Sequence, residues 1–282
     1  MHFQWYPGHM TKAKRMMQEN IKLIDLVIEL VDARIPLSSR NPDIDELGKN
    51  KARLILLNKA DLAEDKWNDA WIRYFEEQGF LAVKVNSRKG GGLKSIQCVV
   101  AAACKEKIER DRKRGILNRP VRAMVVGIPN VGKSTFINSM AGKAAARTGD
   151  RPGVTKGKQW IRLNKQVELL DTPGILWPKF EDQAVGLLLA YIGSIKDEIL
   201  QTEELAAELI LFLNRCYPGV MEEKYQTEHS EDPYVMLRHI AESRHCLLRG
   251  NEPDTEKAAH LLLDDFRGGR LGRLTLEYPP EM

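Results

Sequence analysis

Short apolar runs alternate with amphipathic stretches through the first two thirds of the chain. Six of these runs predict strands, and the stretches between them have apolar residues at helical spacing. This alternation predicts an α/β fold in which a mainly parallel sheet of six strands is covered by helices on both faces. Strands are expected at about 24–31, 53–58, 81–86, 121–127, 158–163 and 166–171, and helices near 12–22, 41–50, 65–79, 93–113 and 133–142.

The pattern changes after Pro178. Apolar residues then recur only at helical spacing, and the one later candidate for a strand is 274–278. We therefore expect two domains, one over 1–178 with a basic N-terminal arm and an all-α domain over 179–282. The expected helices of the second domain lie at 183–195, 203–215, 233–246 and 255–266.

The net charge of +4 conceals a strong asymmetry between the two parts of the chain. Residues 1–179 hold 33 Lys and Arg against 19 Asp and Glu, whereas residues 180–282 hold 10 against 20. The first part is thus the one expected to face a polyanion such as RNA. The alternative is a solvated helix face, because the stretch 105–110 also places opposite charges at pairing distance along a helix.

Four cysteines without C-x-x-C spacing indicate neither a zinc site nor a disulfide framework. No apolar run approaches the roughly 18 residues that a membrane span requires. We expect a soluble, cytoplasmic protein that has no membrane partner and is a monomer.

A glycine-rich loop follows the fourth expected strand and precedes a helix. The stretch Gly127-Ile-Pro-Asn-Val-Gly-Lys-Ser134 matches G-x-x-x-x-G-K-[ST], whose backbone N–H groups surround phosphate oxygens. A glycine turn beside an ordinary surface lysine is the alternative, which the strand and helix on either side disfavour. The residues expected to hold the phosphates are Asn130, Val131, Gly132, Lys133, Ser134 and Thr135, with Lys133 acting in catalysis and Ser134 binding Mg²⁺.

Three further positions complete a metal and γ-phosphate site. Asp171 ends the sixth expected strand and can orient Mg²⁺ through water, and the N–H of Gly174 can meet the γ-phosphate. Thr155, between the two motifs, is placed to complete the metal shell and to act in catalysis. Together these positions predict a protein whose conformation responds to the γ-phosphate of a bound nucleoside triphosphate.

A candidate guanine-reading motif, Asn58-Lys59-Ala60-Asp61, lies upstream of the phosphate loop. The carboxylate of Asp61 can accept the N1–H and the 2-amino hydrogen of guanine, a pair that adenine does not present. Asn58 can bond N7 and brace the neighbouring loop, and the stem of Lys59 can cover the ring. The alternative is a helix-start turn.

A second base-side loop is expected at Asn86 and Ser87, where Ser87 and backbone N–H groups can meet the guanine O6. The alternative is a simple turn.

The base motif precedes the phosphate loop, which reverses the usual order in GTPases and indicates a circular permutation. Together with Trp5-Tyr-Pro-Gly-His-Met10, Asp32-Ala-Arg-Ile-Pro36 and Asp171-Thr-Pro-Gly174, this order resembles the circularly permuted GTPases of ribosome assembly. The resemblance implies a P-loop GTPase that binds GTP, GDP and Mg²⁺ and hydrolyses GTP to GDP and phosphate. It also implies binding to the precursor of the large ribosomal subunit, its RNA and its proteins, and a late assembly step in which particle-stimulated hydrolysis controls release.

Ile175 occupies the position where many GTPases have a water-orienting glutamine, so unaided hydrolysis is expected to be slow. Asn130 resembles the asparagine of potassium-stimulated GTPases, and a K⁺ ion there is one candidate for the missing charge; a turn-forming asparagine is the alternative.

His9 is the second candidate for completing the catalytic site. Its imidazole would act on the γ-phosphate or its water when RNA orders the basic arm. An exposed or structural histidine is its alternative.

Two other functions are compatible with part of the pattern. A signalling GTPase whose helical tail binds a protein effector is the main alternative, and a phosphate-transferring metabolic enzyme is disfavoured because no further substrate pocket is readable. In the tail, Arg267, Arg270 and Arg273 lie in a glycine-rich stretch that fits either an RNA backbone or a helix cap followed by a loop.

Overall fold

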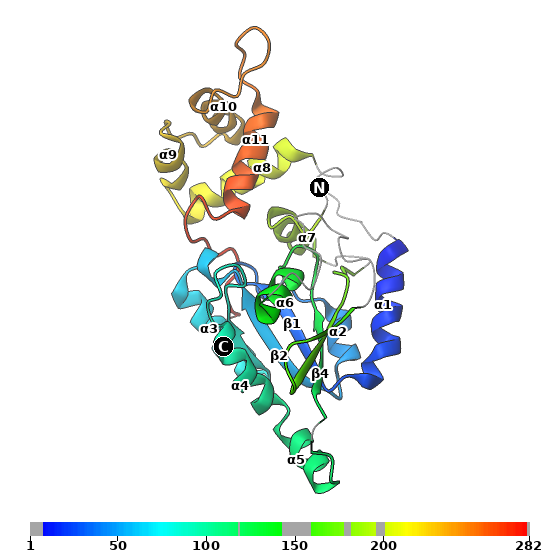
Figure 1. Cartoon of the computed structure of the whole chain (residues 1–282). Helices are drawn as coiled ribbons and strands as arrows, with labels where there is room; N and C mark the ends of the chain where they lie inside the picture. The colour runs from blue at the N-terminus through cyan, green and yellow to red at the C-terminus, as the bar shows by residue number, and fades with distance from the viewer. Residues whose placement is uncertain (1–7, 118, 143–158, 178–181, 196–200, 281–282) are drawn as a thin grey trace. The chain divides into compact units, whose positions relative to one another are not determined.

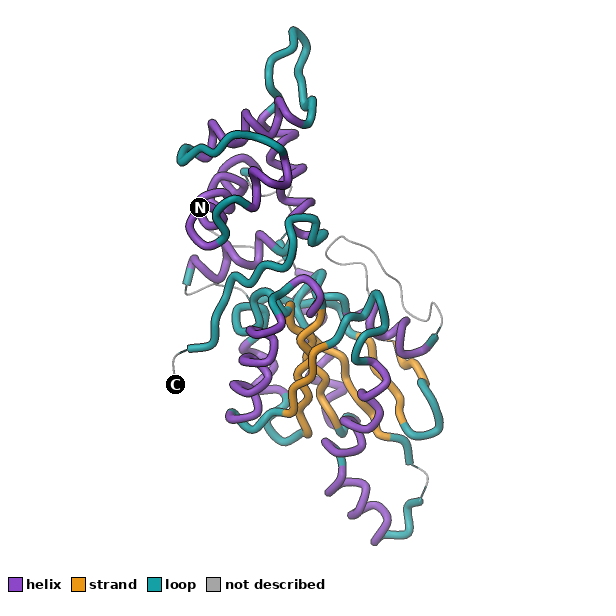
Figure 2. Tube along the Cα trace, turned by 90° about the vertical axis from the view of Figure 1, so that its left-hand side faces the viewer, coloured by secondary structure: helices purple, strands orange, loops and turns teal. Residues whose placement is uncertain are grey.

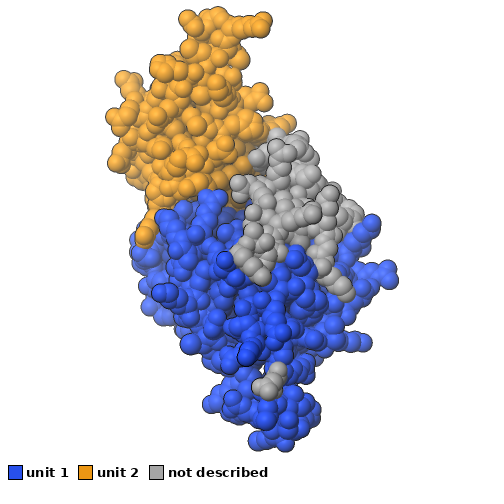
Figure 3. Space-filling view, in the orientation of Figure 1, with its two compact units in different colours: residues 1–185, 275–282 blue, residues 186–274 orange. Residues whose placement is uncertain are grey.

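The computed structural model describes residues 8–117, 119–142, 159–177, 182–195 and 201–280 (Figure 1). The chain forms two compact units, which are coloured in Figure 3. Unit 1 comprises residues 1–185 together with 275–282, and unit 2 comprises residues 186–274. Each unit is described by itself.

A six-stranded sheet forms the centre of unit 1, with the order β3-β2-β1-β4-β6-β5. All neighbouring strands are parallel except β5, which runs antiparallel to β6. The predicted mainly parallel sheet of six strands is therefore confirmed. The strands are β1 (Leu26–Asp32), β2 (Ala52–Asn58), β3 (Leu81–Lys84), β4 (Val121–Val126), β5 (Gln159–Arg162) and β6 (Val167–Asp171).

The strand β1 occupies an inner position, and all seven of its residues are buried. Its neighbours are β2 on one side and β4 on the other, although β4 follows it by about ninety residues. The register pairs Asp32 with Asn58 and Val125 with Asp171. Carboxyl ends of strands from both halves of unit 1 therefore meet at one edge of the sheet.

Helices flank the strands on both sides of the sheet in Figure 2. The predicted helix at 93–113 is divided at Cys104, whose φ and ψ of −105° and 14° depart from helical values. Hydrogen bonds still continue through this position, since Ile108 N donates to Cys104 O at 2.9 Å. The α-helices are α1 (Gly8–Asn20), α2 (Pro42–Leu47), α3 (Asp65–Glu77), α4 (Leu93–Ala103), α5 (Lys105–Lys113) and α6 (Lys133–Ala141).

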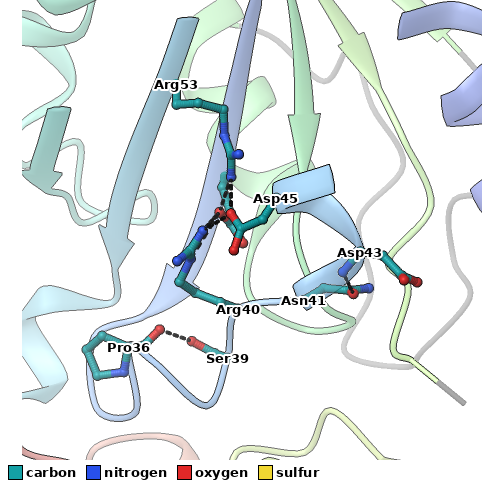
Figure 4. A network of polar contacts seen from close by, with 8 residues as sticks. Pro36, Ser39, Arg40, Asn41, Asp43, Asp45 and Arg53 are labelled. Atoms are coloured by element: carbon teal, nitrogen blue, oxygen red, sulfur yellow. Dashed lines mark hydrogen bonds and ion pairs between the residues drawn. The ribbon is translucent and has the colours of Figure 1, made fainter. Parts of the chain in front are cut away.

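The side of the sheet next to β2 contains aromatic packing and an ionic network. Trp71 and Phe75 of α3 are fully buried against the apolar side chains of β1 and β2. Beside them, Arg40 and Arg53 both contact Asp45, as Figure 4 shows, and both also contact the buried Glu29 at 3.1 and 3.0 Å. Because Glu29 is almost completely buried, its charge requires these partners.

Unit 2 is built from helices, as predicted for most of the tail. The helix α7 (Gln183–Tyr191) begins in unit 1 and continues into unit 2, where α8 packs against α10 and α11. The sequence pattern did not predict α9, which is only six residues long and therefore shows little periodicity. The remaining helices are α8 (Thr202–Cys216), α9 (Val220–Tyr225), α10 (Pro233–Ser243) and α11 (Thr255–Arg267).

Two of the tail arginines have partners inside unit 2. Arg267 donates to the carbonyl of Tyr191 at 3.0 Å, and Arg270 contacts the buried Asp265. Gly268 caps α11. The interpretation of this stretch as a helix cap followed by a loop therefore describes Arg267 and Arg270 better than an RNA contact does.

The boundary between the units lies between residues 185 and 186, whereas the sequence pattern placed it between residues 178 and 179. Unit 2 ends at Leu274, and the segment 275–280 returns to unit 1. This segment forms neither helix nor strand, so the strand suggested at 274–278 is not present. The reason is that its polar groups bond to the turn after β1, to the start of α3 and to the indole of Trp71 within α3, instead of to a neighbouring strand.

Among the described residues, no helix is long and apolar enough to cross a membrane.

Candidate nucleotide-binding site

The carboxyl ends of β1, β2, β4 and β6 bring together the motifs that the sequence separates. Ligands of open α/β sheets bind at such an edge. Asn58 ends β2, Gly127 follows β4, and Asp171 ends β6. The predicted base and phosphate motifs thus occupy neighbouring positions.

Two glycines allow the phosphate loop to approach its neighbours closely. Gly127 has a φ of 147°, and a Cβ there would lie 2.6 Å from the carbonyl oxygen of Leu30. Gly132 has a φ of 99°, and its Cβ would lie 2.4 Å from Nδ2 of Asn58. Both positions therefore need the absence of a side chain.

Lys133 begins α6 and turns its ammonium group into the loop. Its Nζ donates to the carbonyls of Gly127 at 3.1 Å and Ile128 at 2.7 Å. Burial lowers the pKa of Lys133 to about 8, although the carboxylate of Asp171 opposes this shift. A buried ammonium group inside a glycine loop is suited to binding phosphate oxygens.

Asp171 provides a buried oxygen that fits a metal site. Its Oδ1 has no hydrogen-bond partner among the described residues, and burial raises its pKa to about 6 against the opposing effects of Lys133 and the Thr172 N–H. The Thr172 hydroxyl donates to Val125 O at 2.7 Å and holds the strand end in place. A buried carboxylate oxygen without a partner among the described residues agrees with the oxygen ligands that Mg²⁺ requires.

Gly174 packs directly against the phosphate loop. A Cβ at this position would lie 2.8 Å from Nζ of Lys133 and 2.8 Å from the backbone of Pro129. The next residue, Ile175, is 1% exposed, and its N–H donates to Gly127 O at 3.4 Å. Its apolar side chain has no group that can orient a water molecule.

Asn58 links three loops of the site. Its Nδ2 donates to Val131 O at 2.7 Å, and its Oδ1 accepts from the N–H and the hydroxyl of Ser87 at 3.1 and 2.7 Å. The hydroxyl of Ser139 in α6 in turn donates to Ser87 O. The amide of Asn58 therefore braces the phosphate loop, as expected, and the hydroxyl of Ser87 is bonded to Asn58.

The rest of the base motif forms a tight turn. Lys59 has a left-handed φ of 58°, Ala60 N donates to Val85 O at 3.2 Å, and Asn68 Nδ2 donates to Ala60 O at 2.9 Å. Asp61 lies in the short 3-10 helix η2 (Ala60–Leu62), with its carboxylate 3.5 Å from Nζ of Lys89. The side chain of Asp61 is 30% exposed and therefore accessible to a base.

Asn86 lies in the second loop expected beside the base. Its Oδ1 accepts from the N–H groups of Arg88 at 3.0 Å and Lys89 at 2.9 Å. Its side chain thus shapes the second base-side loop.

Asp32 lies at the candidate site, and its role is not evident from its motif in the sequence. It is completely buried, and its Oδ2 lies 2.9 Å from Nζ of Lys59. The sequence feature that could have identified Asp32 is its position at the end of a central apolar strand.

The remaining predicted site residues are Thr155, His9, Asn130 and Thr135. Thr155 lies outside the described residues, as does the side chain of His9, whose backbone belongs to α1. Asn130 has a left-handed φ of 59° in the phosphate loop. Thr135 lies in the first turn of α6 and is partly buried.

Comparison with known proteins finds a family described as 50S ribosome-binding GTPase, whose model matches residues 122–244. The match begins in β4 and leaves Asn58 and Asp61 outside, as expected if the base motif has been moved upstream of the other motifs.

Full-length relatives match the whole chain. Ribosome biogenesis GTPase A of Bacillus cereus is 51% identical over 100% of this chain and 95% of its own length. The protein of the same name from Thermotoga maritima is 34% identical over 99% of this chain and 95% of its own length. The crystal structure of GNP-bound YlqF from T. maritima has a TM-score of 0.67 and 28% identity, covering 96% of this chain and 100% of that one.

Proposed function

Because this chain belongs to the ribosome biogenesis GTPase A family, we propose that it binds the precursor of the large ribosomal subunit in its GTP state and leaves after hydrolysis. The chain is a ribosome-assembly GTPase. Its place in a late step, its contacts with ribosomal RNA and proteins, and its action as a cytoplasmic monomer belong to the proposal.

The observation that carries the nucleotide part of the proposal is the bond from Asn58 to Val131. It supports one pocket in which the amides of the 130–135 stretch and Lys133 hold phosphates while Asp61 recognises guanine. Ser134 and Asp171 would hold Mg²⁺, the latter through water, together with Thr155. When bound, the ion would offset the phosphate charge, and Gly174 would respond to the γ-phosphate.

The observation that supports an RNA-facing surface is a group of cations at the end of α5. This helix projects beyond the end of the sheet in Figures 1 and 2. Exposed cations at its last turn form no ion pair with any described residue, in contrast to Lys107, which contacts Asp25 and Asp111 at 3.2 and 2.9 Å. Unpaired cations are suited to phosphate contacts. The exposed cations are Arg110, Arg112, Lys113 and Arg114.

Co-sedimentation with precursors of the large subunit tests the proposal. We expect the chain to sediment with the particle when a non-hydrolysable GTP analogue is bound and to remain in solution with GDP. Equal behaviour in both nucleotide states would contradict nucleotide-controlled release. Absence of particle binding in both states would favour the alternative, a signalling GTPase with a protein effector.

A variant of α5 tests the RNA-facing surface separately. Replacing Arg110, Arg112, Lys113 and Arg114 by Gln should reduce particle binding and flatten its dependence on salt, because fewer counterions are released. A matched control replaces Arg215, Arg238, Arg244 and Arg249 of unit 2. An equal loss in both variants would show that α5 has no special role.

The link between nucleotide state and the helical unit is a further part of the proposal. Gly174 directly precedes the segment that leads into α7, so ordering of this glycine by the γ-phosphate can change the position of the tail. Small-angle scattering should then differ between the GDP-bound and GTP-analogue-bound protein. Identical profiles would contradict this coupling.

A further inference from the structure

The segment 275–278 bonds to two parts of unit 1 that lie beside the guanine-reading loop. Leu276 N donates to Arg34 O at 3.0 Å, in the turn that follows β1. Glu64 N donates to the hydroxyl of Thr275 at 3.2 Å, and the indole N–H of Trp71 donates to Glu277 O at 3.0 Å. The segment therefore joins the turn after β1 to the beginning of α3, which itself follows the base motif.

The side chain of Glu277 strengthens this attachment. Its carboxylate accepts from the N–H of Leu37 at 2.6 Å, and from the N–H and hydroxyl of Ser38 at 3.0 and 2.5 Å. Burial raises the pKa of Glu277, and the bonds from Ser38 and Leu37 oppose that shift. A half-buried carboxylate that accepts from three donors of one turn holds that turn in a defined conformation.

The turn held by Glu277 orients Asp32. Arg34 donates to Asp32 through Nε at 2.9 Å, through Nη2 at 2.9 Å and through its backbone N–H at 3.1 Å. The hydroxyl of Ser39 accepts from Asp32 N at 3.0 Å. Burial alone would raise the pKa of Asp32, but the charges of Arg34 and Lys59 outweigh it and hold that pKa well below its usual range.

Asp32 in turn contacts the base motif. Its Oδ2 lies 2.9 Å from Nζ of Lys59, the residue between Asn58 and Ala60. Fixing this ammonium group restricts the methylene stem before a nucleotide arrives, and restriction of this kind reduces the entropy lost on binding.

We propose that Asp32 is a positioning residue for guanine recognition through Lys59, and that the segment 275–278 holds the turn from which Asp32 acts. The inference rests on the proposed guanine site at residues 58–61. It adds to that site a segment from the far end of the chain.

Kinetics on the full-length protein test the proposal with two variants, Asp32→Asn and Glu277→Gln. For Asp32→Asn we expect the KM for GTP and the dissociation rate of a fluorescent GDP to rise about tenfold, within the range of couplings between contacting residues. The kcat at saturating GTP should stay within about twofold, because the phosphate loop is unchanged. Glu277→Gln should change KM in the same direction by about threefold, since it acts one contact further away.

Two controls separate positioning from general destabilisation. Asp265→Asn removes a buried carboxylate of unit 2 that accepts from Tyr225 at 3.0 Å, and it should leave KM unchanged even where it lowers the melting temperature. The second control is the double variant Asp32→Asn with Lys59→Gln. If Asp32 acts through Lys59, the double variant should bind GDP no more weakly than Lys59→Gln alone.

The outcomes distinguish the possible failures. Additive effects of Asp32→Asn and Lys59→Gln, or an unchanged KM in Glu277→Gln, would overturn the inference while the guanine site stands. If the unmodified protein bound ATP as tightly as GTP, the proposed site itself would fail. Should Asp32→Asn not fold, Glu277→Gln still decides the question, because it leaves the buried ion pairs of Asp32 intact.

Discussion

The amide of Asn58 donates to the backbone carbonyl of Val131 at 2.7 Å, although 73 residues separate the two positions. The base motif and the phosphate loop thus share a direct bond. The same amide accepts two bonds from Ser87, so a single side chain defines the spacing of three loops.

Asn58→Ala should weaken GDP binding at least tenfold. The substitution leaves Val131 O and the Ser87 donors without their partner, and each buried unsatisfied group costs about 1–3 kcal/mol. Titration with a fluorescent GDP measures the effect. Asn214→Ala is a matched control, because it removes an amide bond of 2.9 Å to Ser230 O within unit 2. Equal GDP affinities of the parent and Asn58→Ala proteins would contradict the assignment.

Gly174→Ala should reduce single-turnover GTP hydrolysis by about a hundredfold. The added Cβ would lie 2.8 Å from both Nζ of Lys133 and the backbone of Pro129, so the loop must move. Gly91→Ala is the control, since its Cβ would meet Asn86 at an ordinary 3.5 Å. A normal rate in Gly174→Ala would remove Gly174 from the γ-phosphate site.

Potassium should accelerate single-turnover hydrolysis about tenfold or more relative to sodium at equal ionic strength, because a bound cation offsets charge on the phosphates. Asn130→Gly should abolish the difference. Glycine tolerates the left-handed φ of 59° at this position, so the variant removes the amide without straining the loop. Identical rates in the two salts would exclude a role for K⁺ at Asn130.

His9→Ala should abolish most of the stimulation of hydrolysis by the ribosomal particle, by about a hundredfold, while unstimulated hydrolysis stays unchanged. The expected reason is that the imidazole acts on the attacking water only when RNA orders the basic arm. Phosphate release with and without particles measures both rates, and His239→Ala in α10 is the control. Full stimulation of His9→Ala would remove the catalytic role.

The stability of the protein should depend on Asp32 at acidic pH. Because its folded-state pKa is lowered, its contribution is complete above the unfolded value of about 4 and is lost as the pH falls below it. The loss should approach about 1.4 kcal/mol per pH unit. Urea unfolding between pH 3 and pH 6 should show a flatter acid dependence for Asp32→Asn than for the exposed-site control Asp69→Asn. Equal slopes would show that the ion pairs of Asp32 do not stabilise the fold.

The five parallel strands were predictable because each contains a short apolar run, and in a parallel sheet such runs are buried on both faces. The antiparallel strand β5 differs, because Ile161 is the one buried residue among its four. The phosphate loop was equally readable, since its glycines meet steric demands that no other residue meets at Gly127 and Gly132. Bracing of the neighbouring loop by Asn58 was also expected. Its partner Val131 could be inferred once the permuted strand order placed the two loops together.

Contacts that depend on strand register were not predictable from one sequence. The pair between Asp32 and Lys59 requires β1 and β2 to end side by side, which follows from the register and not from any local pattern. The attachment of Glu277 to Ser38 spans 239 residues and has no periodicity to reveal it. Similarly, α9 is too short for its apolar spacing to stand out.

The strand order also has a consequence for synthesis of the chain. The strands β1, β2 and β3 are consecutive in sequence and adjacent in the sheet, so the strands around the proposed guanine-reading motif are translated first, whereas the segment 275–278 that holds the turn after β1 is translated last. Lys133 of the phosphate loop is translated between these two and follows β4, on the other flank of β1. A nascent chain that emerges N-terminus first therefore forms the strands that carry the base motif before those that carry the phosphate loop.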